Sequence, residues 1–350
     1  MKRQPITTGQ CMENLVHEEL DKTLLTQSIS EECDFRDLKL IVFSDLHRGG
    51  GDGADDFLRC ERIYNSVLDY YDTLEYRLLL LGDVEELWET DLGEVVENHQ
   101  ESLLKEKQFV DAGRYVRFYG NHDDVLKDNT DELKSFMGDY KPIRALNISV
   151  TDKGEELGQL FFTHGDQGDH YGKIFRLALR YLWRGLQNKL RFSVYLPSRN
   201  SDLRKKNDYE LYTWSAKQKR PLALIAGHTH HAVFMSETKA DQLRRISKEL
   251  LRDVADEEKK LAMENALKTW RESADTEMDN SQGVKIPVNP APTYFNTGCC
   301  AFVDGEITGI EIVEGSILLI KWSGDSGMPR REVLRSTELE SLFARIRASK

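Results

Sequence analysis

Short apolar runs alternate with amphipathic stretches along most of the chain. Five runs contain a short apolar or β-branched stretch and end in polar residues: 38–44, 76–83, 114–124, 159–166 and 222–231. Between them, residues 54–72 carry apolar side chains at helical spacing, and 92–109 have a helix-like pattern. This alternation of strand and helix patterns predicts an α/β architecture with a mostly buried central sheet.

The two ends of the chain have different patterns. Residues 12–28 have roughly helical spacing, which predicts a short leading helix. Residues 292–322 contain short strand patterns separated by glycine-containing turns, so this part should be more antiparallel. We therefore expect an N-terminal extension over 1–37, a main domain over 38–322 and a C-terminal tail or helix over 323–350.

Two long segments interrupt the alternation. Residues 171–220 contain 13 Lys or Arg and three acidic residues, within a chain of net charge −12. Arg176, Arg180 and Arg184 recur there on one helix face, so the segment predicts a basic helical lid. Residues 237–275 are a charged helical stretch with a narrow apolar seam. That seam indicates a solvated helix packed on the body, or else a contact between two copies of the chain.

The composition limits the class of protein. A net charge of −12 does not favour nucleic acid or an anionic membrane as a partner. The five cysteines are odd in number and include no C-x-x-C spacing, which argues against a disulfide framework and for reduced thiols in the cytoplasm. The first residues lack the apolar stretch of a secretory signal, and no run approaches the ~18 apolar residues of a membrane span.

Acidic, amide and imidazole side chains follow the five apolar runs directly. In order along the chain they are Asp45 and His47, Asp83, Asn121 with His122 and Asp123, His164 with Asp166, and His228 with His230. In open α/β sheets, ligands bind beyond the carboxyl ends of the strands. A single such strand end could be a helix cap or a surface histidine, but five in one chain predict a common site.

The residue types indicate the chemistry of that site. Carboxylate, imidazole and amide oxygen without thiolate suit Mn, with Fe or Zn as alternatives. There are too many ligands for one ion with an open position, and about the right number for two. Two ions roughly 3.5–4 Å apart can contact both the attacking and the leaving oxygens at phosphorus, and they acidify a water between them.

These motifs together resemble the calcineurin-like metallophosphoesterase superfamily, whose pattern is D-x-H, G-D, G-N-H-[D/E], H and G-H-x-H. The resemblance implies a four-layer α/β/β/α sandwich, here with a helical lid insertion and a second charged insertion. It implies that His122 contacts the phosphate or assists the leaving oxygen, and that Asp123 orients His122. It also implies one metal held by Asp45, His47, Asp83 and His230, and a second held by Asp83, Asn121, His164 and His228.

The branch of the superfamily is indicated by the stretch "GDVEELWE". Protein Ser/Thr phosphatases carry an arginine after this G-D, and this chain has none. An acid followed by Trp88 looks more like the UDP-diacylglucosamine diphosphatases of lipid A synthesis, which also place a lid between H-G-D and G-H-x-H. That family has arginine where this chain has His122, and the 237–275 insertion is foreign to it.

Three classes of function follow. The first is a dimetal phosphohydrolase acting on a small nucleotide- or lipid-linked phosphoester or pyrophosphate. The alternatives are a nuclease, which the acidic body disfavours, and a non-catalytic metal scaffold, which has no need of His122. Substrate contacts are predicted for Arg48, Arg176, Arg180 and Arg184. Alternatively, Arg48 is a plain surface arginine and the lid arginines pair with acids on the body. An amphipathic lid is also compatible with peripheral membrane contact.

Overall fold

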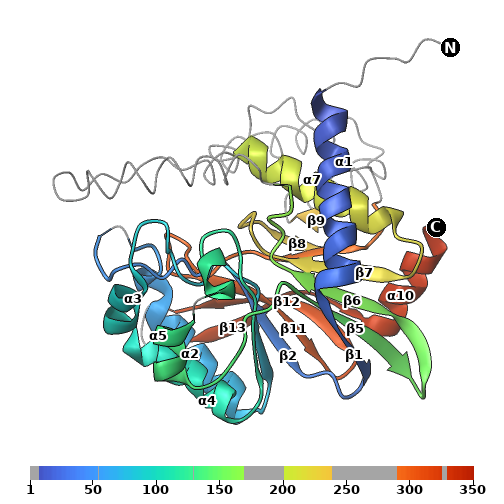
Figure 1. Ribbon diagram of the computed structural model, residues 1–350. Coiled ribbons are helices and arrows are strands. Elements are labelled where there is room, and N and C mark those ends of the chain that lie inside the picture. Colours follow the sequence, from blue (N-terminus) through green and yellow to red (C-terminus); the bar gives the residue numbers. More distant parts are fainter. Residues whose placement is uncertain (1–7, 54, 129, 169–200, 239–289, 325–328) are drawn as a thin grey trace, which may run out of the picture.

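The protein consists of two β-sheets packed face to face, with helices on both outer faces (Figure 1). The computed structural model describes residues 8–53, 55–128, 130–168, 201–238, 290–324 and 329–350. Within these residues, no helix is both long enough and apolar enough to cross a membrane.

The first sheet has six strands. In spatial order they are β13 (Arg330–Glu338), β12 (Ser316–Ser323), β11 (Ile307–Val313), β2 (Leu40–Phe43), β3 (Arg77–Leu80) and β4 (Tyr115–Arg117). The strands β2, β3 and β4 are parallel, whereas β11, β12 and β13 join them through antiparallel pairs.

The second sheet has seven strands. In spatial order they are β1 (Ser28–Asp34), β5 (Ala145–Asp152), β6 (Glu155–Thr163), β7 (Leu222–Ala226), β10 (Tyr294–Thr297), β8 (Ala232–Phe234) and β9 (Glu237–Thr238). The neighbours β6, β7 and β10 run parallel to one another.

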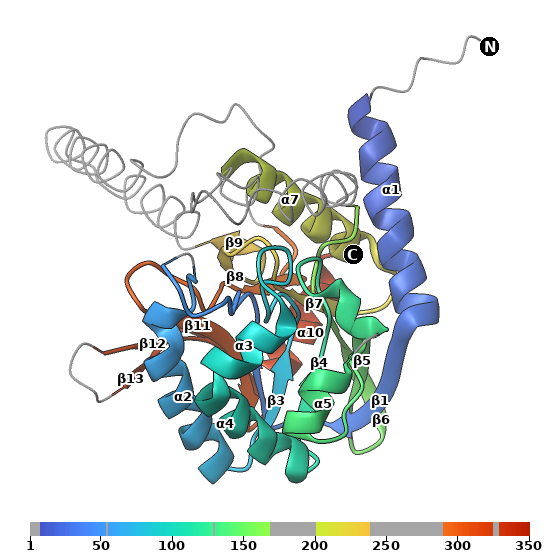
Figure 2. The same cartoon turned by 60° about the vertical axis from the view of Figure 1, so that its left-hand side comes forward.

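Helices form the two outer layers (Figures 1 and 2). The six-stranded sheet is covered by α2 (Leu58–Thr73) and α4 (Gln100–Asp111), beside which lie α3 (Leu92–Asn98), the 3₁₀ turn η2 (Asp124–Lys127) and α5 (Asp131–Met137). The seven-stranded sheet carries α7 (Ser201–Lys217), with α1 (Thr8–Lys22) and the π-turn η1 (Thr23–Gln27) beside it. The last helix, α10 (Leu339–Ala348), packs instead against the core between the two sheets.

The core lies in layers because strand side chains alternate between the two faces of a sheet. Leu40 and Val42 on β2 point into the space between the sheets, where they join Phe162 of the opposite sheet. Their neighbours Ile41 and Phe43 pack instead in the layer beneath α2. Since both faces are buried, such strands are apolar along their whole length, which is the pattern from which the sequence predicted them.

The predicted four-layer α/β fold is confirmed, with local differences. The 92–109 stretch forms two helices that meet at His99, whose buried ring contacts Asp55 at 2.7 Å and Glu61 at 2.9 Å. Residues 28–34 of the expected N-terminal extension form β1, which pairs in parallel with β5. Residues 330–348 of the expected tail form β13 and α10.

The direction of the strands determines where the site lies. Asp45 follows β2, Asp83 follows β3 and Asn121 follows β4 in the first sheet, so all three leave the same edge. His164 follows β6 and His228 follows β7 in the second sheet, again at one edge. Residues 171–200 and 239–275 of the two predicted insertions lie outside the described residues.

Candidate metal centre

The loops after β2 and β3 stay paired beyond the ends of the strands. The backbone N–H of Asp45 donates to the Gly82 carbonyl at 3.2 Å, and that of His47 donates to the Asp83 carbonyl at 3.0 Å. Arg48 continues the pairing with Val84 at 2.8 Å. The D-x-H and G-D motifs therefore form one paired unit, in which the position of one motif determines the position of the other.

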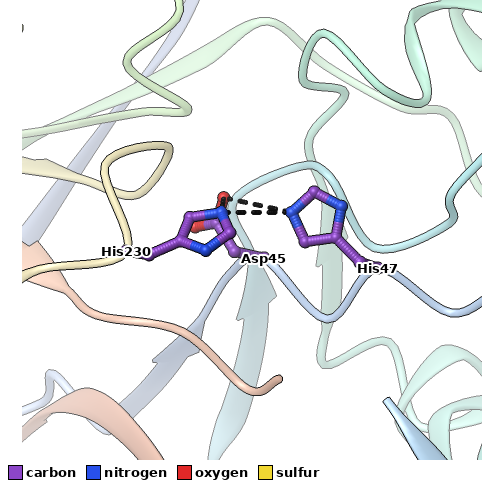
Figure 3. A group of neighbouring side chains, drawn as sticks. All are labelled: Asp45, His47 and His230. Atoms are coloured by element: carbon purple, nitrogen blue, oxygen red, sulfur yellow. Dashed lines mark hydrogen bonds and ion pairs between the residues drawn. The ribbon is translucent and has the colours of Figure 1, made fainter. Parts of the chain in front are cut away.

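Asp45, His47 and His230 form the first group of candidate ligands (Figure 3). The Nε2 atoms of His47 and His230 face each other at 3.2 Å. Asp45 Oδ1 lies 3.3 Å from the His230 Nε2 and 3.9 Å from the His47 Nε2. These three ligand atoms thus converge on one point, although the residues follow strands of two different sheets.

Asp83, His164 and His228 form the second group, and Asn121 lies with them. The His164 Nε2 lies 3.0 Å from Asp83 Oδ2 and 3.2 Å from Asn121 Oδ1. The rings of His164 and His228 are 5.1 Å apart between centroids. All seven residues predicted as ligands are therefore brought to the same end of the sandwich, in two adjacent groups.

Five of these seven residues have a left-handed backbone. Their φ angles are 54° at Asp45, 50° at His47, 50° at Asp83, 69° at His228 and 58° at His230. A non-glycine residue in this region costs of order 1–3 kcal/mol and persists where the surroundings enforce it. Such outliers cluster at functional sites, and here they coincide with the candidate ligands.

Two glycines permit the close approach of the motifs. A side chain at Gly120 would overlap Asp83 Oδ1, and its Cβ would lie 2.7 Å from the His164 ring. A Cβ at Gly227 would lie 2.6 Å from Asp45 Oδ2. The glycines of G-N-H and G-H-x-H are therefore required by packing against ligands on other strands.

Hydrogen bonds at the far ring nitrogens orient two of the histidines. His164 donates from Nδ1 to the Leu81 carbonyl at 2.8 Å, and His47 Nδ1 lies 2.9 Å from Glu86 Oε2. Each bond leaves Nε2 as the nitrogen facing the centre, as metal-binding histidines require. The donor set and its orientation therefore fit divalent ions.

The charge states also fit such ions. Burial opposes the charged form of His164, but Asp83 outweighs it and raises the pKa of His164 to about 10. Burial likewise opposes protonation of His47, and Glu86 outweighs it to raise the pKa of His47 to about 9. For His230, burial dominates and lowers the pKa to about 4. Because ligands must lose their protons to bind, a metal would replace the protons on His47 and His164.

Glu86, rather than Asp123, orients His122. Glu86 Oε1 lies 2.8 Å from the His122 Nδ1, and the same carboxylate also bonds His47. On its other side, His122 is stacked by Trp88, with 3.7 Å between the ring centroids and 14° between the planes. The Trp88 indole N–H donates to the Asn121 carbonyl at 2.8 Å. The expectation that Asp123 orients His122 is thus wrong in this structure.

Asp123 binds backbone instead. Its Oδ1 accepts from the N–H of Gly120 at 2.7 Å, and its Oδ2 accepts from the N–H of Val84 at 3.0 Å. Asp123 also pairs with Arg117 at 2.7 Å. The Asp123 carboxylate therefore joins the loop after β3 to the loop after β4.

Arg48 differs from its predicted role as a substrate contact. Its side chain has no exposed surface, and its guanidinium pairs with Glu85 at 2.8 Å and Glu106 at 2.7 Å. Glu85 pairs in turn with Arg117. Arg48 and Arg117 thus alternate with Asp123, Glu85 and Glu106 in a chain of buried charges behind the metal centre, which we call the buried ion chain.

The charges of the buried ion chain depend on one another. Burial by itself raises the pKa of Glu85, but Arg117 and Arg48 outweigh it, so this pKa lies below its usual value. Tyr64 and Tyr115 donate their hydroxyls to Glu106 at 3.0 Å and 2.9 Å. Sequence analysis missed this role of Arg117, since nothing in a strand pattern shows that an arginine at its end is buried.

The last part of the predicted lid segment forms α7, which reaches the candidate site. Asn207 Nδ2 lies 3.4 Å from the His228 Nε2. The predicted substrate contacts Arg176, Arg180 and Arg184 lie outside the described residues. Asp166 pairs with Arg144 at 2.7 Å.

The chain was compared with known families, curated proteins and solved structures. A family model described as calcineurin-like phosphoesterase matches residues 38–232, which is more than half of the chain. A solved structure of vacuolar protein sorting 29 from Cryptosporidium parvum is similar at a TM-score of 0.35 and 9% identity, over 86% of this chain and 98% of that one. No curated protein matches the chain.

The buried ion chain generates a stability prediction. Arg117→Met would leave Glu85 and Asp123 without their shared partner, and breaking such a buried pair costs about 3–5 kcal/mol. The matched control is Arg77→Met on the neighbouring strand, because Arg77 pairs with Glu31 at 2.6 Å where both side chains are about a third exposed. That change should cost ~0–1 kcal/mol. Urea unfolding measures both changes. If the two variants lose equal free energy of unfolding, the buried ion chain contributes no more to stability than a surface pair.

Proposed function

This chain belongs to the calcineurin-like phosphoesterase family, and from that premise we propose that it hydrolyses a small phosphorylated substrate with two divalent metal ions. The family consists of metal-dependent phosphoesterases, so the protein is a hydrolase of phosphoester bonds. The observation that carries the proposal is the convergence of two adjacent ligand groups at the ends of both sheets.

The two groups would hold one ion each. Asp45, His47 and His230 would bind the first ion, and Asn121, His164 and His228 the second. Asp83 would bridge the two ions. Its carboxylate lies in the second group, and its charge also acts on Asp45 and on His47 of the first.

When bound, two such ions stabilise charge on phosphoryl oxygens and lower the pKa of water to a value near neutral. The oxygen-and-nitrogen donor set favours Mn²⁺, with Fe or Zn as alternatives. The absence of thiolate ligands from both groups supports this choice.

His122 would protonate the leaving oxygen. Its Nδ1 is held by Glu86, so Nε2 is the nitrogen that can transfer a proton. Its ring lies edge-on to that of the candidate ligand His47, with 4.6 Å between centroids. Stacking on Trp88 fixes the plane of the imidazole beside the centre. A general acid needs this combination of proximity and fixed orientation.

Cations from the lid segment would bind the substrate's phosphate. Arg48, Arg117 and Arg144 near the centre are engaged by buried acids. The charge of Arg204, at the start of α7, acts on His230 of the first ligand group, which supports a role for cations of this segment. With Arg176, Arg180 and Arg184 in the same segment, the lid would attract a multiply charged, small substrate of the cytoplasm.

Metal dependence tests the proposed function. Chelator-treated protein should lose phosphoesterase activity on p-nitrophenyl phosphate, and added Mn²⁺ should restore it. Asp83→Asn should lower the content of both ions, because one bridging carboxylate serves both. Glu311→Gln is the control, since Glu311 is a buried carboxylate that accepts from Tyr71 and Tyr76 outside the centre. Full activity in metal-free protein would rule out the proposal.

A second prediction separates the acid from the ligands. His122→Ala should keep both ions and lower the rate by ~10²–10⁴ on an ester with a poor leaving group, which needs a proton. Activated p-nitrophenyl phosphate should be affected far less. His17→Ala serves as the control, because His17 lies outside the candidate centre. Its Nε2 is 3.2 Å from the Thr213 hydroxyl. If His122→Ala loses metal, His122 is a ligand and the assignment is wrong.

A further inference from the structure

The turn between β7 and β8 carries two candidate ligands with one residue between them. His228 and His230 belong to different ligand groups, and Thr229 separates them. Both histidines have a left-handed backbone, which costs conformational free energy for any residue other than glycine. The turn is therefore a strained conformation that other contacts must maintain.

Thr229 contacts two elements, α7 and β10, that carry none of the candidate ligands. Its side chain is buried, with 1% exposed. Its Oγ1 donates to Asp208 Oδ1 on α7 at 2.8 Å and accepts from Asn296 Nδ2 on β10 at 3.1 Å. One hydroxyl thus binds the middle of the turn to a helix and to a strand.

Asp208 is the centre of this arrangement. Its carboxylate is 4% exposed and receives three donors: Thr229, the Tyr294 hydroxyl at 2.7 Å and the His231 Nδ1 at 3.1 Å. His231, which follows the last ligand, is thereby also fixed to α7. A buried carboxylate with three partners is costly to disturb, because each lost partner leaves a buried group unsatisfied.

Asn296 completes the contacts from the opposite side. Its amide nitrogen donates to the Gly227 carbonyl at 2.6 Å and lies 2.9 Å from the Tyr294 hydroxyl. Its Oδ1 accepts from the Gly298 N–H at 3.0 Å. The turn is thus held at Gly227, Thr229 and His231, and the two residues between these points are the histidines that face the centre.

We propose that Thr229 and Asp208 are positioning residues of the metal centre, which keep the turn in the form that presents His228 to one ion and His230 to the other. The inference rests on the proposed function in that it takes these histidines as ligands. The hydrogen bonds hold the strained turn in the metal-free protein. Metal binding therefore does not have to supply the free energy of forming the turn.

Co²⁺ binding to the full chain tests this directly, without any measurement of activity. Chelator-stripped protein is titrated with Co²⁺ and followed by its visible absorption. Thr229→Val keeps the shape but removes the hydroxyl, and it should weaken Co²⁺ binding by about 10–100-fold, as loss of groups that orient ligands does. Thr229→Ser restores the hydroxyl and should bind nearly as the unaltered protein does.

A matched control separates positioning from general stability. Ser215 is a buried hydroxyl on the same helix, and it bonds Thr293 at 2.9 Å. Ser215→Ala should lower the unfolding temperature without changing Co²⁺ affinity. Should Thr229→Val fail to fold, Asp208→Asn provides the second variant, which keeps the volume of the side chain and should also weaken Co²⁺ binding.

The outcomes are distinct. If the unaltered protein binds no Co²⁺, both the proposed function and this inference fail. If it binds two equivalents and Thr229→Val or Asp208→Asn binds them equally tightly, only the positioning role fails. If Ser215→Ala weakens Co²⁺ binding as much as Thr229→Val, the contacts of Thr229 act through general stability and the inference is overturned. Weaker binding in both Thr229→Val and Asp208→Asn, with recovery in Thr229→Ser and no change in Ser215→Ala, supports it.

Discussion

The geometry of the candidate metal centre depends on the buried ion chain. Arg117 bridges Asp123 and Glu85, and Arg48 bridges Glu85 and Glu106, all without appreciable contact with water. Arg117 ends β4, and Arg48, Glu85 and Asp123 lie in the loops after β2, β3 and β4, whereas Glu106 lies on α4. The alternating charges therefore join the loops that carry the D-x-H, G-D and G-N-H motifs. Buried ions are stable only when every charge is paired. The chain of charges therefore admits few arrangements of these three loops.

The second sheet supplies the rest of the centre by different means. His164 donates to the Leu81 carbonyl, and the backbone N–H of His228 donates to Asp45. The turn that carries His228 and His230 is held through Thr229 and His231, which both bond the buried carboxylate of Asp208. The left-handed turn at His228 and His230 is the strained part of this half. Packing of the two sheets against each other brings the halves together, so neither sheet contains either complete ligand group.

The sequence allowed the fold, and the grouping of the candidate ligands at one end of it, to be predicted because both leave local signals. An apolar run that ends in Asp or His indicates where a buried strand stops and which candidate metal ligands follow it. The partners of those donors leave no such signal. Asp123 is next to His122 in sequence, yet Glu86 orients that ring, because adjacent side chains leave the backbone in different directions. Arg48 likewise gives no sign in the sequence that it points inward.

The central claim is that two ions bind between the sheets and share Asp83. Anomalous diffraction at the manganese edge, from crystals grown with Mn²⁺, tests it most directly. The account predicts two peaks roughly 3.5–4 Å apart, the spacing of two-metal sites. One peak should lie among Asp45, His47 and His230, the other beside His164, with Asp83 touching both. A single peak, or one coordinated by Glu86 between His47 and His122, would contradict it.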